Sequence, residues 1–340
     1  MYAYIASIGL ISPQHTCTGD FSCGVEYNHQ NRVACIEPTY KEYINPVQLR
    51  RMSRILKLGL GAAQLCLHQI DGFSPDAIVV GTGLACVGDL ELFLKSALEH
   101  EGANISPIPF INSSHNTVAS QIARILSFRG YNNTFCHKHL SFEHALLDSL
   151  MLLHEQEAEQ VLVGGVDEFD PALFGFWDHL GYWKKENEAV GAMAGEGAGF
   201  FLLHRNAQKP CIAKISAIKT LHGPLKQDTW VSFLLENGLQ SKDIDTFVLG
   251  LNGHQKEDAP YQQLLATVIP PDAQIAAYKH LCGTYMTGTA FALAIAANAL
   301  QSGAFPTSCI QRVGQKSKIN KVLIYNQYWN QMHALILLEK

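Results

Sequence analysis

The same order of segment types occurs twice along this chain, and this repetition limits the folds that it can adopt. In the first half, the apolar run DAIVVGTG (76–83) is followed by a helical pattern rich in small residues, NTVASQIARILSF (116–128), and by the strand-like segments EQVLVGGVDE and GAGFFLLHR. In the second half, DTFVLGLNG, GTYMTGTAFALAIAANAL and KVLIYNQYWNQMHALILLEK follow in the same order. We interpret the pattern as an internal duplication of one α/β unit.

Two similar α/β halves predict a layered domain. Alternating helices and buried strands are typical of α/β folds, and small side chains allow helices to approach one another closely. We therefore expect the small-residue helices to be buried between two sheets, with halves 1–207 and 208–340 forming one compact unit. Because ligand sites favour a crevice between such halves, we expect the functional pocket there.

Composition and charge argue against several classes of function. The 340 residues are 47% hydrophobic, enough for a substantial core, and 25 basic residues stand against 30 acidic ones with no block of like charge. This balance favours neither nucleic acid nor an anionic membrane as a partner. The segment MYAYIASIGLISP lacks the basic start and long apolar run of a signal peptide, so we expect a β-strand there and a cytoplasmic protein without a membrane span.

Cysteine and histidine usage raises the question of a nucleophile. Nine cysteines at irregular spacing, without a C-x-x-C pair, argue against a disulfide framework and a structural zinc site. Cys136 is followed by His137, His139 and His144. A nearby imidazolium can lower a thiol pKa and generate a thiolate, although such a Cys is more often an inert core residue. The three histidines lack a second cluster that would complete a metal site, so we predict no metal.

The order and spacing of these segments resemble the β-ketoacyl-acyl-carrier-protein synthases, the condensing enzymes of the thiolase-like fold. The resemblance covers most of the chain and implies a duplicated αβαβα layered fold, although a fold by itself does not establish an activity. The segments that carry it are RRMSRILKLGLGAA, NTVASQIARILSFRGYNNT, VLVGGVDE and GEGAGFFLL in the first half, and YKHLCGTYMTGTAFALAIA in the second.

The resemblance also implies a chemistry. In this family a Cys accepts an acyl chain, two His residues assist decarboxylation of a malonyl thioester and stabilise the enolate, and backbone amides form the oxyanion hole. The acyl chains arrive on the phosphopantetheine of an acyl carrier protein. We therefore expect an acyl carrier protein as partner and no cofactor bound to this chain itself.

The nucleophile position of the family is occupied by a histidine in this sequence. The family Cys stands five residues before a His in a helix, and a Gly-Gly-x-acid strand end follows. His144 and the run Gly164 to Asp167 match these marks, which assigns His139 to the nucleophile position. Cys136 falls three residues earlier, at the preceding strand.

The first family His stands eight residues before an Asp. If that Asp is Asp258, the His position is Gly250, and this is the register we favour. His254 is the other candidate, but it requires a four-residue insertion and loses the Asp.

The second family His ends a Lys-x-x-x-Gly-His pattern. Lys279 and Gly283 are retained in KHLCGT, but Thr284 stands where the His belongs. The family also has a glycine-rich loop near its C-terminus, whereas residues 322–340 contain no glycine and the bulky Tyr328 and Trp329 occupy the loop region.

All three chemical positions thus lack the family residue while the scaffold motifs are retained. This pattern resembles the chain-length factors, non-condensing subunits that pair with an active ketosynthase in type II fatty acid or polyketide biosynthesis. The RRMSR and KHLCG motifs are most similar to those of aryl-polyene and flexirubin-type pathways. We expect a dimer, either with a ketosynthase or between two copies of this chain.

Two other functions are open at this point. One is an active 3-oxoacyl synthase that uses Cys136 and His254, and the other is an acyl-thioester binder or hydrolase with His139 or His144 as base. The residues that we expect around the pocket in all three cases are Cys136, His144, Lys279, Cys282, Met286, Tyr328 and Trp329.

Overall fold

A computed structural model describes residues 1–25, 27, 30–70, 74–100, 105–188, 190–207 and 210–340. Its strands are β1 (Ala3–Ile11), β2 (Ala77–Gly81), β3 (Tyr131–Phe135), β4 (Gln160–Asp167), β5 (Gly197–His204), β6 (Ala213–His222), β7 (Thr246–Leu249), β8 (Gln274–Ala277), β9 (Ile310–Arg312), β10 (Lys321–Tyr328) and β11 (Met332–Glu339). Its α-helices are α1 (Pro46–Leu49), α2 (Arg54–Leu67), α3 (Val87–Glu99), α4 (Pro107–Asn112), α5 (Thr117–Ile125), α6 (Ser141–His154), α7 (Pro171–His179), α8 (Gln227–Glu236), α9 (Gln255–Thr267), α10 (Lys279–Cys282) and α11 (Thr289–Ser302).

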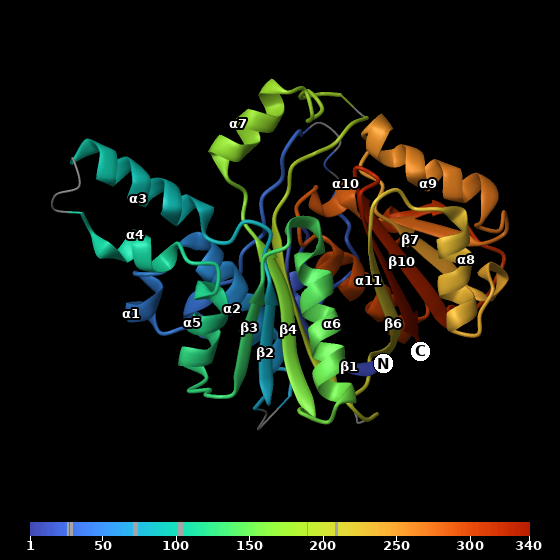
Figure 1. The fold of residues 1–340 in the computed structure, drawn as a ribbon, viewed down its shortest axis with the longest axis horizontal. Coiled ribbons are helices and arrows are strands. Elements are labelled where there is room, and N and C mark those ends of the chain that lie inside the picture. The colour runs from blue at the N-terminus through green and yellow to red at the C-terminus, as the bar shows by residue number, and fades with distance from the viewer. Residues whose placement is uncertain (26, 28–29, 71–73, 101–104, 189, 208–209) are drawn as a thin grey trace.

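The strands form a sheet in the order β3-β2-β4-β5-β1-β6-β11-β10-β7-β8-β9. Apart from β9, this order is symmetric about the contact between β1 and β6, so that β2 corresponds to β7, β4 to β10 and β5 to β11. The halves meet through a short antiparallel pairing in which Ala3 faces Ile215. The predicted duplication is therefore confirmed (Figure 1). The predicted division at 207/208 falls in the connection between β5 and β6, and residues 208–209 lie outside the described part.

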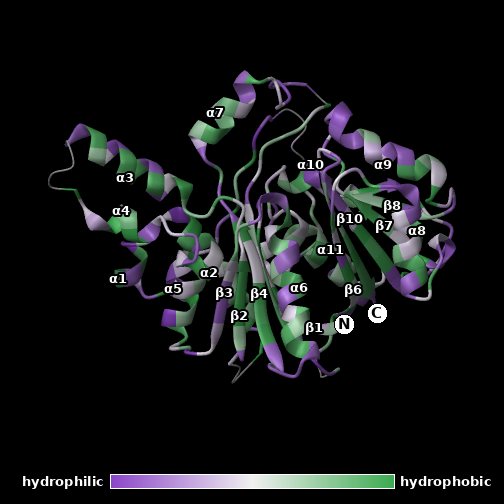
Figure 2. Cartoon of the chain, in the orientation of Figure 1, coloured by the Kyte–Doolittle hydropathy of each residue, from purple (hydrophilic) through white to green (hydrophobic). Residues whose placement is uncertain are grey.

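Three clusters of buried side chains define the layers. The central cluster is built on α6 and α11 with the inner faces of the strands, for example Leu146 and Leu293. A second cluster packs α2 and α5 onto the first-half strands, and a third packs α8 and α9 onto the second-half strands. The two halves of the sheet thus alternate with three helix layers, and this succession confirms the expected thiolase-like fold (Figures 1 and 2).

One of the two helices expected in the central layer lies elsewhere. The helix α11 is central and almost entirely buried, because its run of alanines allows it to pack against both halves of the sheet. The helix α5, predicted from the segment 116–128, instead packs on the outer face against α2, and its counterpart in the central layer is α6. Small residues indicate close packing of a helix, but they do not specify which face of the sheet it covers.

The other local predictions differ mainly at their boundaries. The N-terminal strand is β1, and the strand expected at 76–83 is β2. The motif RRMSRILKLGLGAA is helical only from Arg54, where α2 begins, because Ser53 is extended and separates α2 from the short helix α1. The described chain contains no helix with the length and apolarity that a membrane crossing requires.

Candidate functional site

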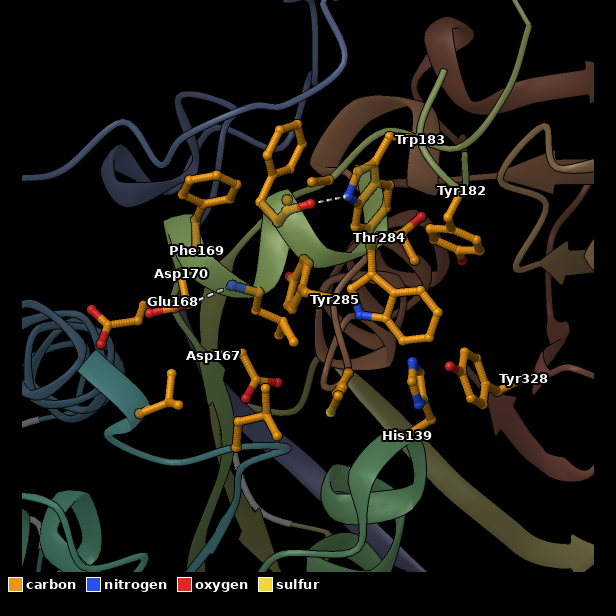
Figure 3. A pocket seen from close by; sticks show the side chains of 18 of the residues that line it. His139, Asp167, Glu168, Phe169, Asp170, Tyr182, Trp183, Thr284, Tyr285 and Tyr328 are labelled. Carbon is orange, nitrogen blue, oxygen red and sulfur yellow. Dashed lines mark hydrogen bonds between the residues drawn. The ribbon is translucent and has the colours of Figure 1, made fainter. Parts of the chain in front are cut away.

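A cavity of about 90 Å³ lies where the carboxyl ends of β2, β4 and β10 approach one another. Its wall comes from the segments after β2 and β4, helix α7, the turn before α6, the connection between α10 and α11, and the end of β10 (Figure 3). His139, Thr284, Met286 and Tyr328, which were predicted from the sequence, all line it. Cys136, His144, Lys279, Cys282 and Trp329 do not line it.

His139 lies in the turn that precedes the N-terminus of the central helix α6. It belongs to a 3-10 turn, Lys138–Leu140, in which Lys138 has a φ of 53° and redirects the chain from β3 into the helix. The His139 ring stacks on Tyr328 with centroids 3.5 Å apart and planes 11° apart. Burial, together with the nearby Lys279 and Lys138, lowers the pKa of His139 to about 3. The imidazole is therefore neutral at physiological pH and offers no positive charge that would stabilise a thiolate or an enolate.

Gly250 has no room for a side chain. It follows directly after β7, and an added Cβ would stand 2.5 Å from Tyr261 Oη and 2.6 Å from Asn326 Oδ1. The carboxylate of Asp258 accepts the backbone N–H groups of Asn252 and Gly253, so the loop that follows Gly250 is held in place. An imidazole at this position would require both neighbouring side chains to move.

His254, the alternative to Gly250, lies in an aromatic cluster beside the cavity. Its ring centroid is 5.2 Å from that of Tyr182 and 5.5 Å from that of Trp329. Tyr182 lines the cavity, but His254 does not. Trp329 is at the turn between β10 and β11, where Trp329 and Asn330 have positive φ angles of 49° and 52°, as a type I′ hairpin turn requires.

Thr284 lies where two glycine-containing segments touch. Its backbone N–H donates to Met193 O at 2.7 Å, and its carbonyl accepts from the Gly195 N–H at 3.2 Å. Gly283 approaches Gly195 so closely that an added Cβ would be 2.4 Å from the Gly195 Cα. The Thr284 hydroxyl has no hydrogen-bond partner among the described residues. Lys279 is buried in α10, and burial lowers its pKa.

Neither of the thiols predicted near the pocket lines the cavity. Cys136 follows the end of β3, and its S–H donates to Gly83 O at 3.4 Å. Burial and the nearby Asp167 raise the pKa of the Cys136 thiol. Cys282 is fully buried and donates to Gly283 O, and burial raises its pKa also. Both environments favour the thiol over the nucleophilic thiolate.

The three histidines near Cys136 do not converge. His144 faces His137, with the two Nδ1 atoms 2.6 Å apart, while His139 turns to Tyr328. Burial, then His137 and His222, lower the pKa of His144. In the part of the chain that the structure describes, no group of three or more His, Cys, Asp or Glu side chains could hold a metal ion.

Comparison with known proteins identifies the family. Residues 27–240, well over half of the chain, match the family described as "Beta-ketoacyl synthase, N-terminal domain". The chain belongs to the β-ketoacyl synthase family. A search of curated protein sequences gives no significant match.

Solved structures share the fold of this family member at low sequence identity. "The ishigamide ketosynthase/chain length factor" superposes with a TM-score of 0.78 at 15% identity, covering 100% of this chain and 99% of that one. The "Ketosynthase (ApeO) in Complex with its Chain Length Factor (ApeC) from Xenorhabdus doucetiae" gives 0.78 at 14%, covering 99% and 97%. A β-ketoacyl synthase from Burkholderia phymatum STM815 gives 0.78 at 13%, covering 99% of each chain.

Two motifs of the β-ketoacyl synthase resemblance meet in space. Arg54 of RRMSR donates hydrogen bonds from both terminal guanidinium N–H groups to the carboxylate of Glu196 in GEGAG. Its Nε–H donates to Glu37 at 2.8 Å. Glu196 is fully buried and also accepts the backbone N–H groups of Cys35 and Phe169 at 2.8 Å each. Because Phe169 lines the cavity, this ion pair fixes one wall of the site.

Asp167 ties the two halves together beneath the cavity. Its Oδ1 accepts from Gly83 N–H at 2.7 Å and from the Thr82 hydroxyl at 3.2 Å. Its Oδ2 accepts from the Thr287 N–H and hydroxyl, at 2.9 and 2.8 Å, at the start of α11. Burial raises the pKa of Asp167, and the hydrogen bonds oppose that shift.

Sequence reasoning missed the aromatic part of the wall. It comes from the segment 169–183, which lies between the strand-like segments EQVLVGGVDE and GAGFFLLHR and contains helix α7. Two signals were present in the sequence: Asp170-Pro171, in which Asp170 caps the helix by accepting the Leu173 N–H at 2.8 Å, and a concentration of Phe, Trp and Tyr unusual for a solvent-exposed loop.

Proposed function

We propose that the chain is a non-condensing, chain-length-factor-type subunit of a type II polyketide or fatty acid synthase. The observation that carries the proposal is the state of His139, a neutral imidazole stacked on Tyr328 at the position of the family nucleophile. No thiol is among the described residues that line the cavity.

The proposal follows from what condensation requires. A condensing enzyme stores the acyl chain on a thiolate and uses two imidazoles to drive decarboxylation. In this chain the corresponding positions hold His139, Gly250 and Thr284, and an imidazole cannot be placed at Gly250 without a clash. A neutral imidazole can accept an acyl group, but acyl-imidazoles hydrolyse readily and are poor stores for a growing chain.

The condensing alternative, with Cys136 and His254, has less support. The Cys136 thiol donates to a backbone carbonyl, its pKa is raised, and it does not line the cavity. The His254 ring contacts those of Tyr182 and Trp329, and His254 does not line the cavity.

We further propose that the partner is an active ketosynthase and that an acyl carrier protein delivers the chains. Two of the similar structures are ketosynthases with a chain length factor. A third is described as an acyl-carrier protein in complex with its ketosynthase, with a TM-score of 0.75 at 13% identity, covering 99% of each chain.

The surface of the first half supports a protein partner. The strand β3 forms one edge of the sheet, and its outer residues Tyr131 and Asn132 are exposed. On the same side, α3 and α4 project from the body of the molecule with apolar side chains in solvent, including Leu92 at 60% and Phe110 at 60% (Figures 1 and 2). An unpaired sheet edge beside exposed apolar residues is typical of a protein interface.

Reconstitution tests this function. The chain is co-expressed with a ketosynthase of the same source, and the purified pair is weighed by native mass spectrometry and assayed for condensation with malonyl carrier protein. We expect a one-to-one complex whose turnover survives His139→Ala in this chain and is lost when the partner's nucleophilic cysteine is replaced. Condensation by this chain alone, or loss of turnover with Cys136→Ala here, would contradict the proposal.

A further inference from the structure

The charges on the cavity wall have one sign. Among the described residues that line the cavity are three acids, Asp167, Glu168 and Asp170, and no lysine or arginine. The histidine among them, His139, is neutral because its pKa is about 3. A cleft lined by charges of one sign concentrates ligands of the opposite sign. The lining therefore disfavours anionic ligands and favours cationic ones.

Glu168 is the acid of this wall whose charge is least compensated. Asp167 accepts four hydrogen bonds, and Asp170 caps α7 by accepting the Leu173 N–H. The Glu168 carboxylate, in contrast, accepts no hydrogen bond and forms no salt bridge within the described part of the chain. A ligand in the cavity can therefore reach this carboxylate without displacing a partner from it.

Acidic neighbours outnumber the cation near Glu168. Burial raises the pKa of Glu168 to about 7. Arg54 opposes this shift, and three acids add to it: Asp89, Glu196 and Asp170. Arg54 already donates both terminal N–H groups to Glu196. Asp89 is only 7% exposed, and its Oδ2 has no hydrogen-bond partner among the described residues. A cation beside Glu168 would compensate a negative charge that the described chain offsets only in part.

Most of the remaining wall consists of aromatic rings from the segment 169–183 and the end of β10 (Figure 3). Phe174 and Trp183 lie parallel, with planes 7° apart and centroids 5.8 Å apart, and Tyr182 meets Trp183 edge-on at 4.6 Å. The Trp183 indole N–H donates to Phe174 O at 3.2 Å. Because the rings hold one another, a ligand need not order them. The negative faces of aromatic rings attract cations.

Arg32 shows that rings of this segment accept a cation. Its guanidinium lies 5.6 Å from the ring centroid of Phe169 and 5.7 Å from that of Phe174. Arg32 is exposed and does not line the cavity. No cation of the described chain lies over Trp177 or Tyr182, which do line it. These two rings have no resident cation and can attract one from the cavity.

The size of the cavity and one hydroxyl group limit the ligand further. A cavity of about 150 Å³ in an engineered protein binds benzene, and this one has about 90 Å³ and is partly open. A head group of about five non-hydrogen atoms, such as an alkylated ammonium, suits this volume. Thr284 lines the cavity and is 9% exposed, and its hydroxyl has no hydrogen-bond partner among the described residues. It can bond to a polar group of the ligand.

We infer that this cavity binds a small organic ammonium ion, held by the Glu168 carboxylate and the aromatic rings, with the Thr284 hydroxyl available to a polar group of the ligand. The inference goes beyond the proposed function, because a non-condensing subunit requires no ligand in this cavity. Aromatic rings are the surfaces with which proteins recognise quaternary ammonium groups, so choline is a suitable probe.

Calorimetric titration of the isolated protein tests the inference. The probes are choline and 3,3-dimethyl-1-butanol, which has the same shape and hydroxyl but carries no charge. The pH is about 8, so that Glu168 is ionised. We expect choline to bind at least about tenfold more tightly than the neutral alcohol. Equal affinities, or no binding of choline, would overturn the inference.

A second pair of probes distinguishes a free amine from an amine carried on an acyl chain. These are the N-acetylcysteamine thioesters of 4-(trimethylammonio)butanoic acid and of 5,5-dimethylhexanoic acid, its uncharged counterpart. Tighter binding of the charged thioester than of choline would assign the ammonium group to an acyl chain, and tighter binding of choline would assign it to a free amine. Either result supports the inference.

Matched variants assign the charge recognition to Glu168. Glu168→Gln should weaken choline binding about fivefold and leave the binding of the neutral alcohol unchanged. Glu186→Gln is the control, because Glu186 is exposed and does not line the cavity. It removes the same charge from the molecule and should leave choline binding unchanged. Equal effects of the two substitutions on choline would refute recognition by Glu168.

A pair of variants on α7 tests the rings independently of the carboxylate. Trp177 lines the cavity, whereas Phe176 is 57% exposed and does not line it. Trp177→Leu should weaken choline binding about threefold to tenfold, and Phe176→Leu should leave it unchanged. The Tm of each variant shows whether it is folded. Unchanged choline binding in folded Trp177→Leu would overturn the role of the rings.

The outcome is separable from that of the proposed function. A one-to-one complex with a ketosynthase, together with equal binding of choline and the neutral alcohol, would retain the proposed function and overturn this inference. Selective binding of choline that is lost in Glu168→Gln, in a protein that forms no such complex, would retain the ligand site and overturn the pairing.

Discussion

The ion pair between Arg54 and Glu196 offers a prediction whose magnitude follows from the structure. Glu196 is fully buried, and Arg54 is the cation that compensates its charge. The substitution Arg54→Met keeps much of the apolar stem and removes the guanidinium. The carboxylate is then left with the backbone N–H groups of Cys35 and Phe169 as its remaining donors in the described structure.

Breaking a fully buried ion pair by removing one partner costs about 3–5 kcal/mol. The Arg54 side chain is 36% exposed, so water screens part of the interaction, and we expect a loss of about 2–3 kcal/mol in the free energy of unfolding. With an unfolding entropy of about 2.1 cal/mol/K per residue, the 340 residues give about 0.7 kcal/mol/K. The predicted decrease in Tm is therefore about 3 to 4 °C.

Differential scanning calorimetry measures this decrease. Lys95→Met is the control, because Lys95 forms an exposed i,i+4 pair with Glu91 and should change Tm by less than about 1 °C. Adding Glu196→Gln to Arg54→Met removes the orphaned charge and should recover part of the loss. If Arg54→Met has the same Tm as the wild type, or if the double variant has the lowest Tm of the set, the buried ion pair does not stabilise this wall.

Three further perturbations test the packing, the buried charge and the interface. Gly250→Ala should destabilise the protein by about 1–3 kcal/mol in urea unfolding, because the new Cβ meets Tyr261 and Asn326; Gly175→Ala on α7 meets nothing within 4 Å and should cost no stability. Burial raises the pKa of Glu143 to about 7, so the stability of the wild type should decrease as the pH rises from about 4.5 to 7. The residue in Glu143→Gln does not titrate, so the stability of this variant relative to the wild type should increase from pH 5 to pH 8. The same pH dependence in both proteins would exclude titration of Glu143 in this range. Leu92→Asp should weaken binding of the ketosynthase at least tenfold in calorimetry, and unchanged affinity would move the interface away from α3.

The fold was predictable because its signals are periodic and repeated. The apolar runs that became β2 and β7, and the paired strands β10 and β11, are visible as similar segments in the two halves. Their shared order identified the duplication without any knowledge of contacts. The alanine-rich α11 was correctly expected in the centre, but α5 was not distinguishable from α6 by composition, since both carry an apolar face suited to a sheet.

The site was predictable only where it depends on spacing. Counting residues assigned His139 and Thr284, and the place of the C-terminal loop assigned Tyr328, and all three line the cavity. The sequence could not show that the Cys136 thiol donates to a carbonyl. Cys136 stands three residues before His139, and at the end of a strand this spacing does not specify the direction in which each side chain points.

The ion pair of Arg54 with Glu196 and the position of the aromatic wall over the strand ends were also beyond the sequence. The ion pair joins residues 142 positions apart, and neither residue is unusual in its local context. The wall depends on how α7 folds back over the ends of the strands, which no local pattern specifies.

The most direct test of the central claim is the intact mass of the protein after incubation with acyl carrier protein thioesters, and separately with a thiol-directed ketosynthase inhibitor, for the wild type and Cys136→Ala. The account predicts no adduct at Cys136 on folded protein, because the cavity presents the neutral imidazole of His139 and no thiolate among its described lining residues. Any adduct of the inhibitor at the exposed Cys211 persists in Cys136→Ala. A single acyl adduct that disappears in Cys136→Ala would contradict it and make this chain a condensing enzyme.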